Sequence, residues 1–372
     1  MVVGERLRGL RGFSRLPREE AQKAGGRPSR GGRQPRGLGT RGEKEKQLSG
    51  RISDYDFELP RELVASRPLP ERSASRMLVV DRTAGKLEHC MFRDLPRFIA
   101  PEDLLVLNDS RVIPARLLAD EGRIELLLFS RLGPARWRAF ARPGKRTRPG
   151  DSFRVAGTIA RIESVEESDG TRIVQFEAEP DLEALGHMPI PPYLGREDDE
   201  EDRTRYQTVF ARRNGSVAAP TAGLHFTREI LAALPHAFVT LHVGPGTFLP
   251  VRAEQLDEHR MHEEEYEVST ETAQRINEAR RVIAVGTTSL RVLESLPPGA
   301  VSACGGRTDL FIRPGFAFRH AGALMTNFHL PKSTLFVLVC AFAGAGLMRE
   351  AYAEAIREKY RFFSYGDCML IV

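Results

Sequence analysis

The sequence predicts an α/β protein: a catalytic α/β domain with an inserted small β-barrel domain, preceded by a disordered N-terminal tail. The chain has 372 residues, of which 41% are hydrophobic and 28% charged. Because single cores stop growing at about 250–300 residues, this length favours two domains. Strands alternate with helices after residue 206, which is typical of an α/β sheet. Short strands with little helix between residues 112 and 205 indicate a barrel.

The tail, residues 1–51, is rich in Arg and Gly. Residues 1–50 hold 13 Lys and Arg against five Glu, with Phe13 as the one aromatic residue. Such a segment buries too little apolar surface to offset its ordering entropy, so we expect disorder. An RNA-binding arm is one interpretation, and a dispensable extension is the favoured one. The chain carries a net charge of +5 and the tail +8, so the rest carries −3. The net positive charge of the chain therefore gives no reason to expect that residues 51–372 bind nucleic acid.

Residues 52–111 begin the α/β domain. Pro60 opens a short helix, Met77–Asp81 and Leu104–Asn108 are apolar strands, and a helix lies around Leu95–Ile99. Order is expected from about Ile52.

Residues 112–205 form the predicted barrel. Asp169-Gly170 is a strong hairpin signal, and the acidic run Glu197–Asp202 is interpreted as a solvated linker. The expected strands are Ile124–Ser130, Trp137–Ala141, Ser152–Val155, Ala160–Val165 and Arg172–Glu177.

Residues 206–372 return to the α/β domain. Thr227 can cap a helix at Arg228–Leu234, and Ser269 or Thr270 can cap a helix that runs to Arg281. The other expected elements are strands at Phe238–Val243 and Val282–Val285, helices at Ser289–Leu296 and Met348–Tyr360, and a buried segment at Phe336–Phe342.

Cysteine usage and hydropathy indicate a cytoplasmic protein. The four cysteines are far apart and form no CxxC, which argues against a disulfide framework and against the usual cysteine zinc sites. The longest apolar run, Leu335–Met348, has 14 residues, whereas a bilayer helix needs about 20. No apolar signal-peptide core follows the N-terminal charges. We therefore expect a buried core element here and no membrane association.

The VGTTSLR motif combines a strand end with a helix start. Gly286 allows a sharp turn, and Thr287 and Thr288 place hydroxyls and free backbone N–H groups at the helix N-terminus. This arrangement suits a carboxylate or phosphate, and ordinary helix capping is the alternative. The LHVGPGTF motif has Leu249 where GxGxxG needs its third glycine, so a dinucleotide fingerprint fits poorly.

Histidines are the main candidates for proton transfer. His259 and His262 would share a face on a helix, but without a clear third ligand a zinc site is disfavoured against an acid–base pair. His225 and His329, each taken alone, are more typical of hydrogen-bonded core histidines.

Two further clusters combine charge with aromatic rings. Arg361–Asp367 contains Phe362, Phe363 and Tyr365, which could stack a base or could belong to the core. Residues 131–148 hold seven basic residues and no acid, with Trp137 among them. Two interpretations remain for this segment: a row of basic residues that binds nucleic-acid phosphates, or the solvated face of a strand.

In combination the motifs closely resemble the S-adenosylmethionine:tRNA ribosyltransferase-isomerases of queuosine biosynthesis. The resemblance runs from about Asp54 to Val372 and rests on DYDFELPRELVA, LNDSRVIPARL, SVAAPTAGLHFT, LHVGPGTFLPV, VGTTSLRVLE, TNFHLPKSTLF and YRFFSYGDCMLIV. The segment EGRIELLLF is shorter than the family's usual turn, and the residues just before TNFHLP are unusual. Neither departure touches the clusters.

The resemblance implies a reaction as well as the predicted fold. The ribosyl group of S-adenosylmethionine moves to 7-aminomethyl-7-deazaguanine at the tRNA wobble position and is isomerised, giving epoxyqueuosine with release of adenine and methionine. It implies S-adenosylmethionine as co-substrate, tRNA as partner, no resident cofactor or metal, and we expect a monomer.

The site residues are expectations from the clusters and the resemblance together. The candidates for proton transfer are His225, His242, His259, His262 and His329, and the general base is not chosen among them. The candidates for substrate binding are Thr221, Gly223, Gly244, Gly246, Gly286, Thr287, Thr288, Arg291, Asp309, Asn327, Arg361, Phe362, Phe363, Tyr365 and Asp367. The candidates for RNA binding are Arg136, Arg138, Arg142, Lys145 and Arg146.

Three other functions remain open on the residues alone. They are a catalytically silent RNA-binding protein, a metal hydrolase that uses His259 and His262, and an ordinary methyltransferase that leaves S-adenosylhomocysteine.

Overall fold

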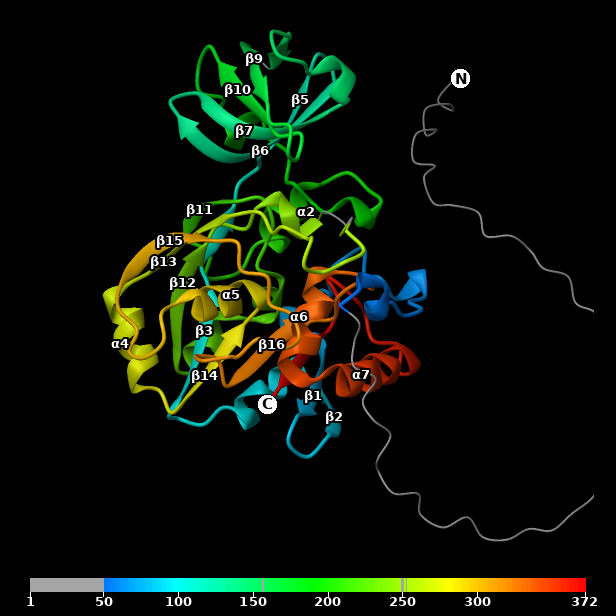
Figure 1. Ribbon diagram of the computed structural model, residues 1–372, viewed down its shortest axis with the longest axis vertical. Coiled ribbons are helices and arrows are strands. Elements are labelled where there is room, and N and C mark those ends of the chain that lie inside the picture. The colour runs from blue at the N-terminus through cyan, green and yellow to red at the C-terminus, as the bar shows by residue number, and fades with distance from the viewer. Residues whose placement is uncertain (1–49, 156, 249–250, 252) are drawn as a thin grey trace, which may run out of the picture. The chain divides into compact units, whose positions relative to one another are not determined.

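A computed structural model describes residues 50–155, 157–248, 251 and 253–372, which belong to one compact unit. Its main feature is a nine-stranded sheet with the strand order β15-β13-β12-β3-β14-β16-β17-β1-β2 (Figure 1). The four central strands β12, β3, β14 and β16 are parallel to one another. The bounds are β1 Arg76–Asp81, β2 Lys86–Met91, β3 Asp103–Asn108, β12 His236–Leu241, β13 Glu264–Val268, β14 Arg281–Val285, β15 Cys304–Thr308, β16 Ala323–Asn327 and β17 Cys368–Ile371.

The central strands are buried on both faces, and their alternate residues belong to two separate hydrophobic cores. In β3, Leu104 and Val106 join one core while Leu105 and Leu107 join the other. In β14, Val282 and Ala284 face the first core, and Ile283 and Val285 the second. The period of two residues per side places near-continuous apolar strands inside the protein, as parallel sheets require.

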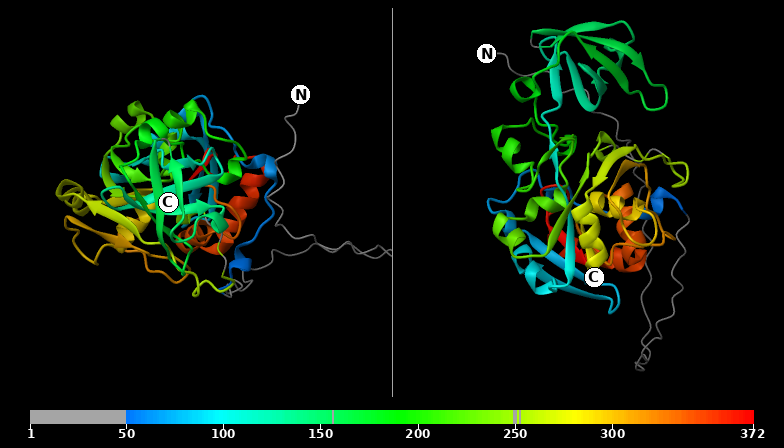
Figure 2. Two further views of the ribbon diagram at one scale, coloured as in Figure 1. Left: turned by 90° about the horizontal axis from the view of Figure 1, so that it is seen from above. Right: turned by 90° about the vertical axis from the view of Figure 1, so that its left-hand side faces the viewer.

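Helices cover the first core, and 3-10 helices with one short α-helix cover the second. In the right-hand view of Figure 2 the yellow and orange helices lie to one side of the strands, and green and cyan segments to the other. The α-helices after the barrel are α3 Arg228–Ala232, α4 Thr270–Glu278, α5 Thr287–Ser295, α6 Thr334–Ala343 and α7 Ala345–Arg357. The 3-10 helices are η1 Ile52–Tyr55, η2 Arg61–Leu63, η3 Arg72–Ala74, η4 Phe92–Phe98, η5 Gly144–Arg146, η6 Pro192–Leu194, η7 Thr221–His225 and η8 Pro245–Phe248.

A second, six-stranded antiparallel sheet has the order β5-β6-β7-β10-β9-β8. It nearly closes, because the Asp120 amide after β5 donates to the Arg154 carbonyl of β8 at 2.9 Å. The strands are β5 Arg116–Ala119, β6 Ile124–Gly133, β7 Arg136–Arg142, β8 Ser152–Val155, β9 Thr158–Val165 and β10 Arg172–Phe176. A two-stranded sheet, β4 Ser110–Val112 with β11 Arg213–Ser216, and the helices α1 Leu182–Leu185 and α2 Glu200–Arg205 flank it in sequence.

The mixed α/β class with a large sheet and a barrel-like sheet is confirmed. The bounds of a separate inserted domain, residues 112–205, stay a prediction. Of the predicted disordered tail, residues 1–51, positions 1–49 lie outside the described residues, but Arg51 is ordered and forms a β-bridge with Gln255. Thr227 and Ser269 cap α3 and α4 as expected, with side chains that accept the Ile230 and Thr272 amides.

The helix expected around Leu95–Ile99 is present as the 3-10 helix η4, Phe92–Phe98, which contains Pro96. Two other local expectations are wrong. His259 and His262 lie in a loop, not on a helix. The acidic run Glu197–Asp202 is more than a solvated linker, since Asp202 is buried and bonded to Arg196 and Tyr365.

The apolar run near the C-terminus divides into α6 and α7, which are bent by 117° relative to one another. Within the described chain, no single helix is long and apolar enough to cross a bilayer, although this bent pair passes by length and composition. Residues Phe336–Cys340 of α6 are buried in the first core, as expected for a core element.

Candidate functional site

A cavity lies where β14 and β16 end, at the carboxyl edge of the parallel strands. Open α/β sheets place ligands at this edge. The cavity volume is about 40 Å³, and its mouth opens to solvent. The lining residues are Tyr206, Ala218, Ala219, Pro220, Thr221, Ala222, Val243, Gly286, Thr287, Thr288, Thr326, Asn327, His329, Leu335, Phe363 and Ser364.

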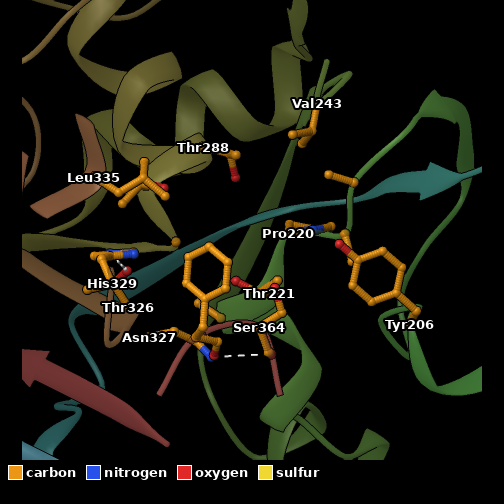
Figure 3. Close-up of a pocket in the computed structure, with 16 residues that line it drawn as sticks. Tyr206, Pro220, Thr221, Val243, Thr288, Thr326, Asn327, His329, Leu335 and Ser364 are labelled. Carbon is orange, nitrogen blue, oxygen red and sulfur yellow. Dashed lines mark hydrogen bonds between the residues drawn. The ribbon is translucent and has the colours of Figure 1, made fainter. Parts of the chain in front are cut away.

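The N-terminus of α5 forms one wall of this cavity. Gly286 takes φ +89° before the helix, a backbone that L side chains rarely adopt, and no side chain caps the helix start. The Thr288 Oγ1 atom is buried and has no hydrogen-bond partner among the described residues. Its hydroxyl points into the space between the labelled residues of Figure 3. A helix N-terminus with a spare hydroxyl can accept an anion, and the anion seat expected from the sequence stays a prediction.

The end of β16 forms the opposite wall. Asn327 is buried, and its Nδ2 donates to the Phe363 carbonyl at 3.0 Å and more weakly to the Ser364 carbonyl at 3.4 Å (Figure 3). These two acceptors determine the orientation of the amide, so Oδ1 must be its acceptor. Oδ1 has no partner within strict hydrogen-bond geometry, and its one described neighbour is His225, which makes a weak side-chain hydrogen bond with Asn327. Asn327 therefore offers a buried, oriented acceptor to a donor on a ligand.

His329 also lines the cavity. Its Nε2 is 3.0 Å from Thr326 Oγ1, and burial lowers its pKa to about 3. The imidazole is thus neutral at pH 7, which suits a hydrogen-bonding role rather than that of a charged acid.

His225 lies next to the cavity wall but not on it. Its Nδ1 is 2.9 Å from Ser75 Oγ, and its ring packs against Phe92. Burial lowers its pKa to about 4, and a side-chain hydrogen bond with Asn327 opposes this shift. His225 is therefore also neutral at pH 7 and supports the Asn327 side of the cavity.

The segment 361–367 (the RFFSYGD loop) brings two of its residues to the cavity. Phe363 and Ser364 line it, whereas Phe362 and Tyr365 are buried in the protein interior. Asp367 and Arg361 close the base of the loop and do not line the cavity. Burial raises the pKa of Asp367.

Arg291 and Glu264 form a buried ion pair behind α5. Glu264 Oε1 also accepts the Gly244 amide at 2.8 Å, and Arg291 donates to the Leu310 carbonyl at 3.0 Å. Arg291 thereby ties α5 to the loop at Gly244 and does not line the cavity.

Three more predicted substrate residues lie outside the cavity. Asp309 is exposed. Gly223 and Gly246 allow close approach, because a Cβ would meet Phe210 at 2.8 Å in the first case and His262 at 2.8 Å in the second.

The remaining candidate histidines lie away from the cavity lining. His242 Nδ1 is 2.8 Å from Ser110 Oγ, and burial lowers its pKa. Burial also lowers the pKa of His259, which packs against Phe311. His262 Nδ1 is 3.7 Å from Asp169 Oδ2 at the β9–β10 hairpin. No group of three or more potential metal ligands occurs in the described part of the chain.

The basic stripe on β7 is already half paired. Arg136 and Arg138 form ion pairs with Glu163 and Glu166 at 2.7 and 2.6 Å. Arg142, Lys145 and Arg146 are exposed, and none of them has a carboxylate partner among the described residues. Trp137 faces the barrel interior, where its Nε1 donates to Glu179 at 3.1 Å. The basic residues without a carboxylate partner thus lie at the end of β7, in the turn η5 and, at Arg148, just after that turn.

Sequence reasoning missed Tyr206, Thr326 and Ser364 as cavity residues. Thr326 and Ser364 lie inside the motifs TNFHLPKSTLF and YRFFSYGDCMLIV and are adjacent in sequence to the predicted site residues Asn327, Phe363 and Tyr365, so their position was the available signal. Tyr206 lies beside none of the predicted site residues.

Comparisons with known proteins agree on one family. The family described as "Queuosine biosynthesis protein" matches residues 52–371. An S-adenosylmethionine:tRNA ribosyltransferase-isomerase of Anaeromyxobacter sp. (strain Fw109-5) is 52% identical, over 86% of this chain and 99% of its own. The enzyme of that name from Halothermothrix orenii is 47% identical, over 87% of this chain and 100% of its own. The crystal structure of S-adenosylmethionine tRNA ribosyltransferase from Thermotoga maritima is 38% identical with a TM-score of 0.50, and covers 86% of this chain and 100% of its own.

Proposed function

Because this chain belongs to the queuosine biosynthesis family and is a ribosyltransferase-isomerase, we propose that it acts on S-adenosylmethionine and on tRNA with 7-aminomethyl-7-deazaguanine at the wobble position. The ribosyl group moves to the aminomethyl nitrogen and is isomerised to an epoxycyclopentanediol. Adenine, methionine and a proton leave, and the tRNA product carries epoxyqueuosine.

The observation that carries the proposal is the cavity, whose walls hold polar atoms that are buried and unpaired or only weakly paired. Thr288 Oγ1 has no hydrogen-bond partner among the described residues, and Asn327 Oδ1 has only the weak side-chain hydrogen bond with His225. An unpaired buried polar atom destabilises a protein by about 1–3 kcal/mol. Such atoms at a cavity therefore indicate a ligand that forms hydrogen bonds with them.

The chemistry of S-adenosylmethionine suits these walls. Its methionine carboxylate is an anion, and we place it at the N-terminus of α5, against Gly286, Thr287 and Thr288. Its ammonium, ribose hydroxyls and adenine amine are hydrogen-bond donors, and one of them would donate a hydrogen bond to Asn327 Oδ1. His329, which is neutral, would orient these groups rather than carry charge, and the neutral His225 would position Asn327 from behind the wall.

We also propose that residues 52–111 and 206–372 form the catalytic domain and that residues 112–205 form an inserted domain that holds tRNA. The support is the exposed cationic group of Arg142, Lys145 and Arg146 on a body that is otherwise near neutral. The enzyme would work in the cytoplasm as a monomer, with no resident cofactor or metal.

Product analysis tests the proposal. Purified protein is incubated with S-adenosylmethionine and tRNA that bears the deazaguanine, and the small molecules are separated by chromatography. Adenine and methionine should appear in a 1:1 ratio with modified tRNA. S-adenosylhomocysteine in place of adenine would show a methyltransferase and defeat the proposal.

A further inference from the structure

The RFFSYGD loop is held at its base by Asp367. Asp367 Oδ2 accepts the Arg361 amide at 2.8 Å, Oδ1 accepts the Arg76 amide at 2.9 Å, and the Asp367 amide donates to the Arg361 carbonyl at 2.8 Å. Gly366 lets the chain cross itself, since a Cβ there would lie 2.5 Å from the Arg361 oxygen. The loop is therefore a tight, defined structure rather than a flexible connection.

Phe363 at the tip of this loop has a strained backbone. Its φ is +74°, in the left-handed region that a residue with a Cβ rarely adopts. The peptide groups around it are all engaged: its amide donates to Phe328 O at 3.0 Å, and its carbonyl accepts from Asn327 Nδ2 and the Gly366 amide. Strain of this kind persists at functional sites where the surroundings over-determine it.

The strained backbone places an aromatic ring at the cavity. Phe363 lines the cavity, and its ring meets Tyr193 edge-on with 4.2 Å between centroids. The neighbouring Phe362 has an ordinary role, since it is fully buried in the first core. The ring of Phe363 therefore lies at the cavity, unlike the ring of Phe362, which only fills the core.

The cavity lacks a formal charge. Among the described residues that line it there is no Asp, Glu, Lys or Arg, and His329 is neutral at pH 7. A sulfonium cation that enters this space finds no carboxylate. The face of an aromatic ring attracts a cation through its quadrupole. The described lining holds two aromatic rings, Tyr206 and Phe363; Tyr206 is fully buried, whereas Phe363 is partly exposed and is the ring that a cation can reach.

We propose that Phe363 is a substrate-binding residue that recognises the sulfonium of S-adenosylmethionine, and that the left-handed backbone of the RFFSYGD loop is retained to present its ring. The inference rests on the proposed function for the identity of the cation. Discrimination between a sulfonium and a neutral thioether then depends on the ring and not on an ion pair.

Binding of two ligands tests the role of the ring. The dissociation constants of S-adenosylmethionine and of S-adenosylhomocysteine, its neutral thioether, are measured by calorimetry for the wild type and for Phe363→Leu. Leucine keeps apolar bulk and removes the ring. The preference for the sulfonium over the thioether should fall by about tenfold in Phe363→Leu. An unchanged preference would overturn the proposal, as would a wild type that binds neither compound.

Melting temperatures of Phe363 variants test whether the left-handed backbone at this position is strained. Elsewhere in proteins glycine is less stabilising than alanine, but at a left-handed position the order is reversed. Phe363→Gly should melt about 2 °C above Phe363→Ala, although both lack the ring. Lys359, exposed at φ +55°, is the matched control, because Lys359→Gly should melt above Lys359→Ala without a change in ligand preference. A more stable Phe363→Ala would contradict the proposed strain.

The outcomes separate this inference from the proposed function. If the wild type releases no adenine from the tRNA reaction but Phe363→Leu still loses its preference for the sulfonium, sulfonium recognition stands and the reaction is wrong. If adenine is released and the preference is unchanged in Phe363→Leu, the reaction stands and the role of Phe363 is wrong.

Discussion

The polar groups of the cavity, at the end of β14 and β16, differ in kind from those at the basic end of β7. In the cavity the polar atoms are buried and uncharged, with no partner among the described residues at Thr288 and only the weak bond with His225 at Asn327. On the barrel the groups are charged and exposed, and Arg136 and Arg138 already have carboxylate partners.

The difference separates two kinds of recognition. A buried polar atom without a partner is costly, so its geometry selects a ligand group by hydrogen bonding. An exposed guanidinium costs little by itself and acts mainly through long-range attraction to phosphate, which salt weakens. We therefore expect selectivity for S-adenosylmethionine from the cavity and salt-dependent affinity for tRNA from the barrel.

The largest effect is expected at Asn327. Asn327→Leu removes the buried acceptor and leaves the Phe363 and Ser364 carbonyls without its amide, so kcat/KM should fall by about a hundredfold or more. Steady-state kinetics with saturating tRNA measure this. Asn277→Leu is the control, because Asn277 makes similar bonds to Val301 away from the cavity lining and its loss should change kcat/KM only a few-fold. Equal losses in both variants would remove the special role of the cavity.

The neutral histidines predict a pH effect on stability. The folded-state pKa values of His329 and His225 are about 3 and about 4, below the 6.5 of an unperturbed histidine. The unfolded chain therefore takes up protons first as the pH falls. The stabilisation is complete above pH 6.5 and is lost progressively below it, by about 2 kcal/mol per histidine between pH 6.5 and 5.

Urea unfolding at pH 7 and pH 5 checks this loss. His329→Gln and His225→Gln should each flatten the dependence of the unfolding free energy on pH. A dependence that is unchanged in both variants would mean that these histidines are protonated in the folded protein, contrary to their burial.

On the barrel, replacing Arg142, Lys145 and Arg146 together by alanine should weaken tRNA binding by about tenfold. Each phosphate contact contributes about 0.7–0.9 to the slope of log affinity against log salt, so that slope should flatten by about two to three. Arg136 and Arg138 form the matched control pair, since their charges are already neutralised by Glu163 and Glu166. An unchanged slope in the triple variant would move the tRNA surface elsewhere.

The smallest effect is expected from the tail. Deleting residues 1–49, which precede the family match at residue 52, should leave kcat/KM within a few-fold at physiological salt. A loss of tRNA affinity by orders of magnitude would favour the RNA-binding arm that its charge allows.

The sequence predicts the strands better than the site. Short continuous apolar runs identify β3 and β14, and the Gly286 turn identifies the start of α5, because each of these features is local. The pairing of Arg291 with Glu264 could not be predicted, since 27 positions separate the two and each alone is typical of an exposed residue. Tyr206 and Ser364 meet at the cavity through folding of distant segments, which no local pattern records.

The division between cavity and barrel is tested most directly by calorimetric titration of S-adenosylmethionine, in the absence of tRNA, into two variants. The account predicts that Asn327→Leu loses at least tenfold in affinity for S-adenosylmethionine, while the variant lacking Arg142, Lys145 and Arg146 binds it like the wild type. Weakened binding by the barrel variant, together with unchanged binding by Asn327→Leu, would contradict it.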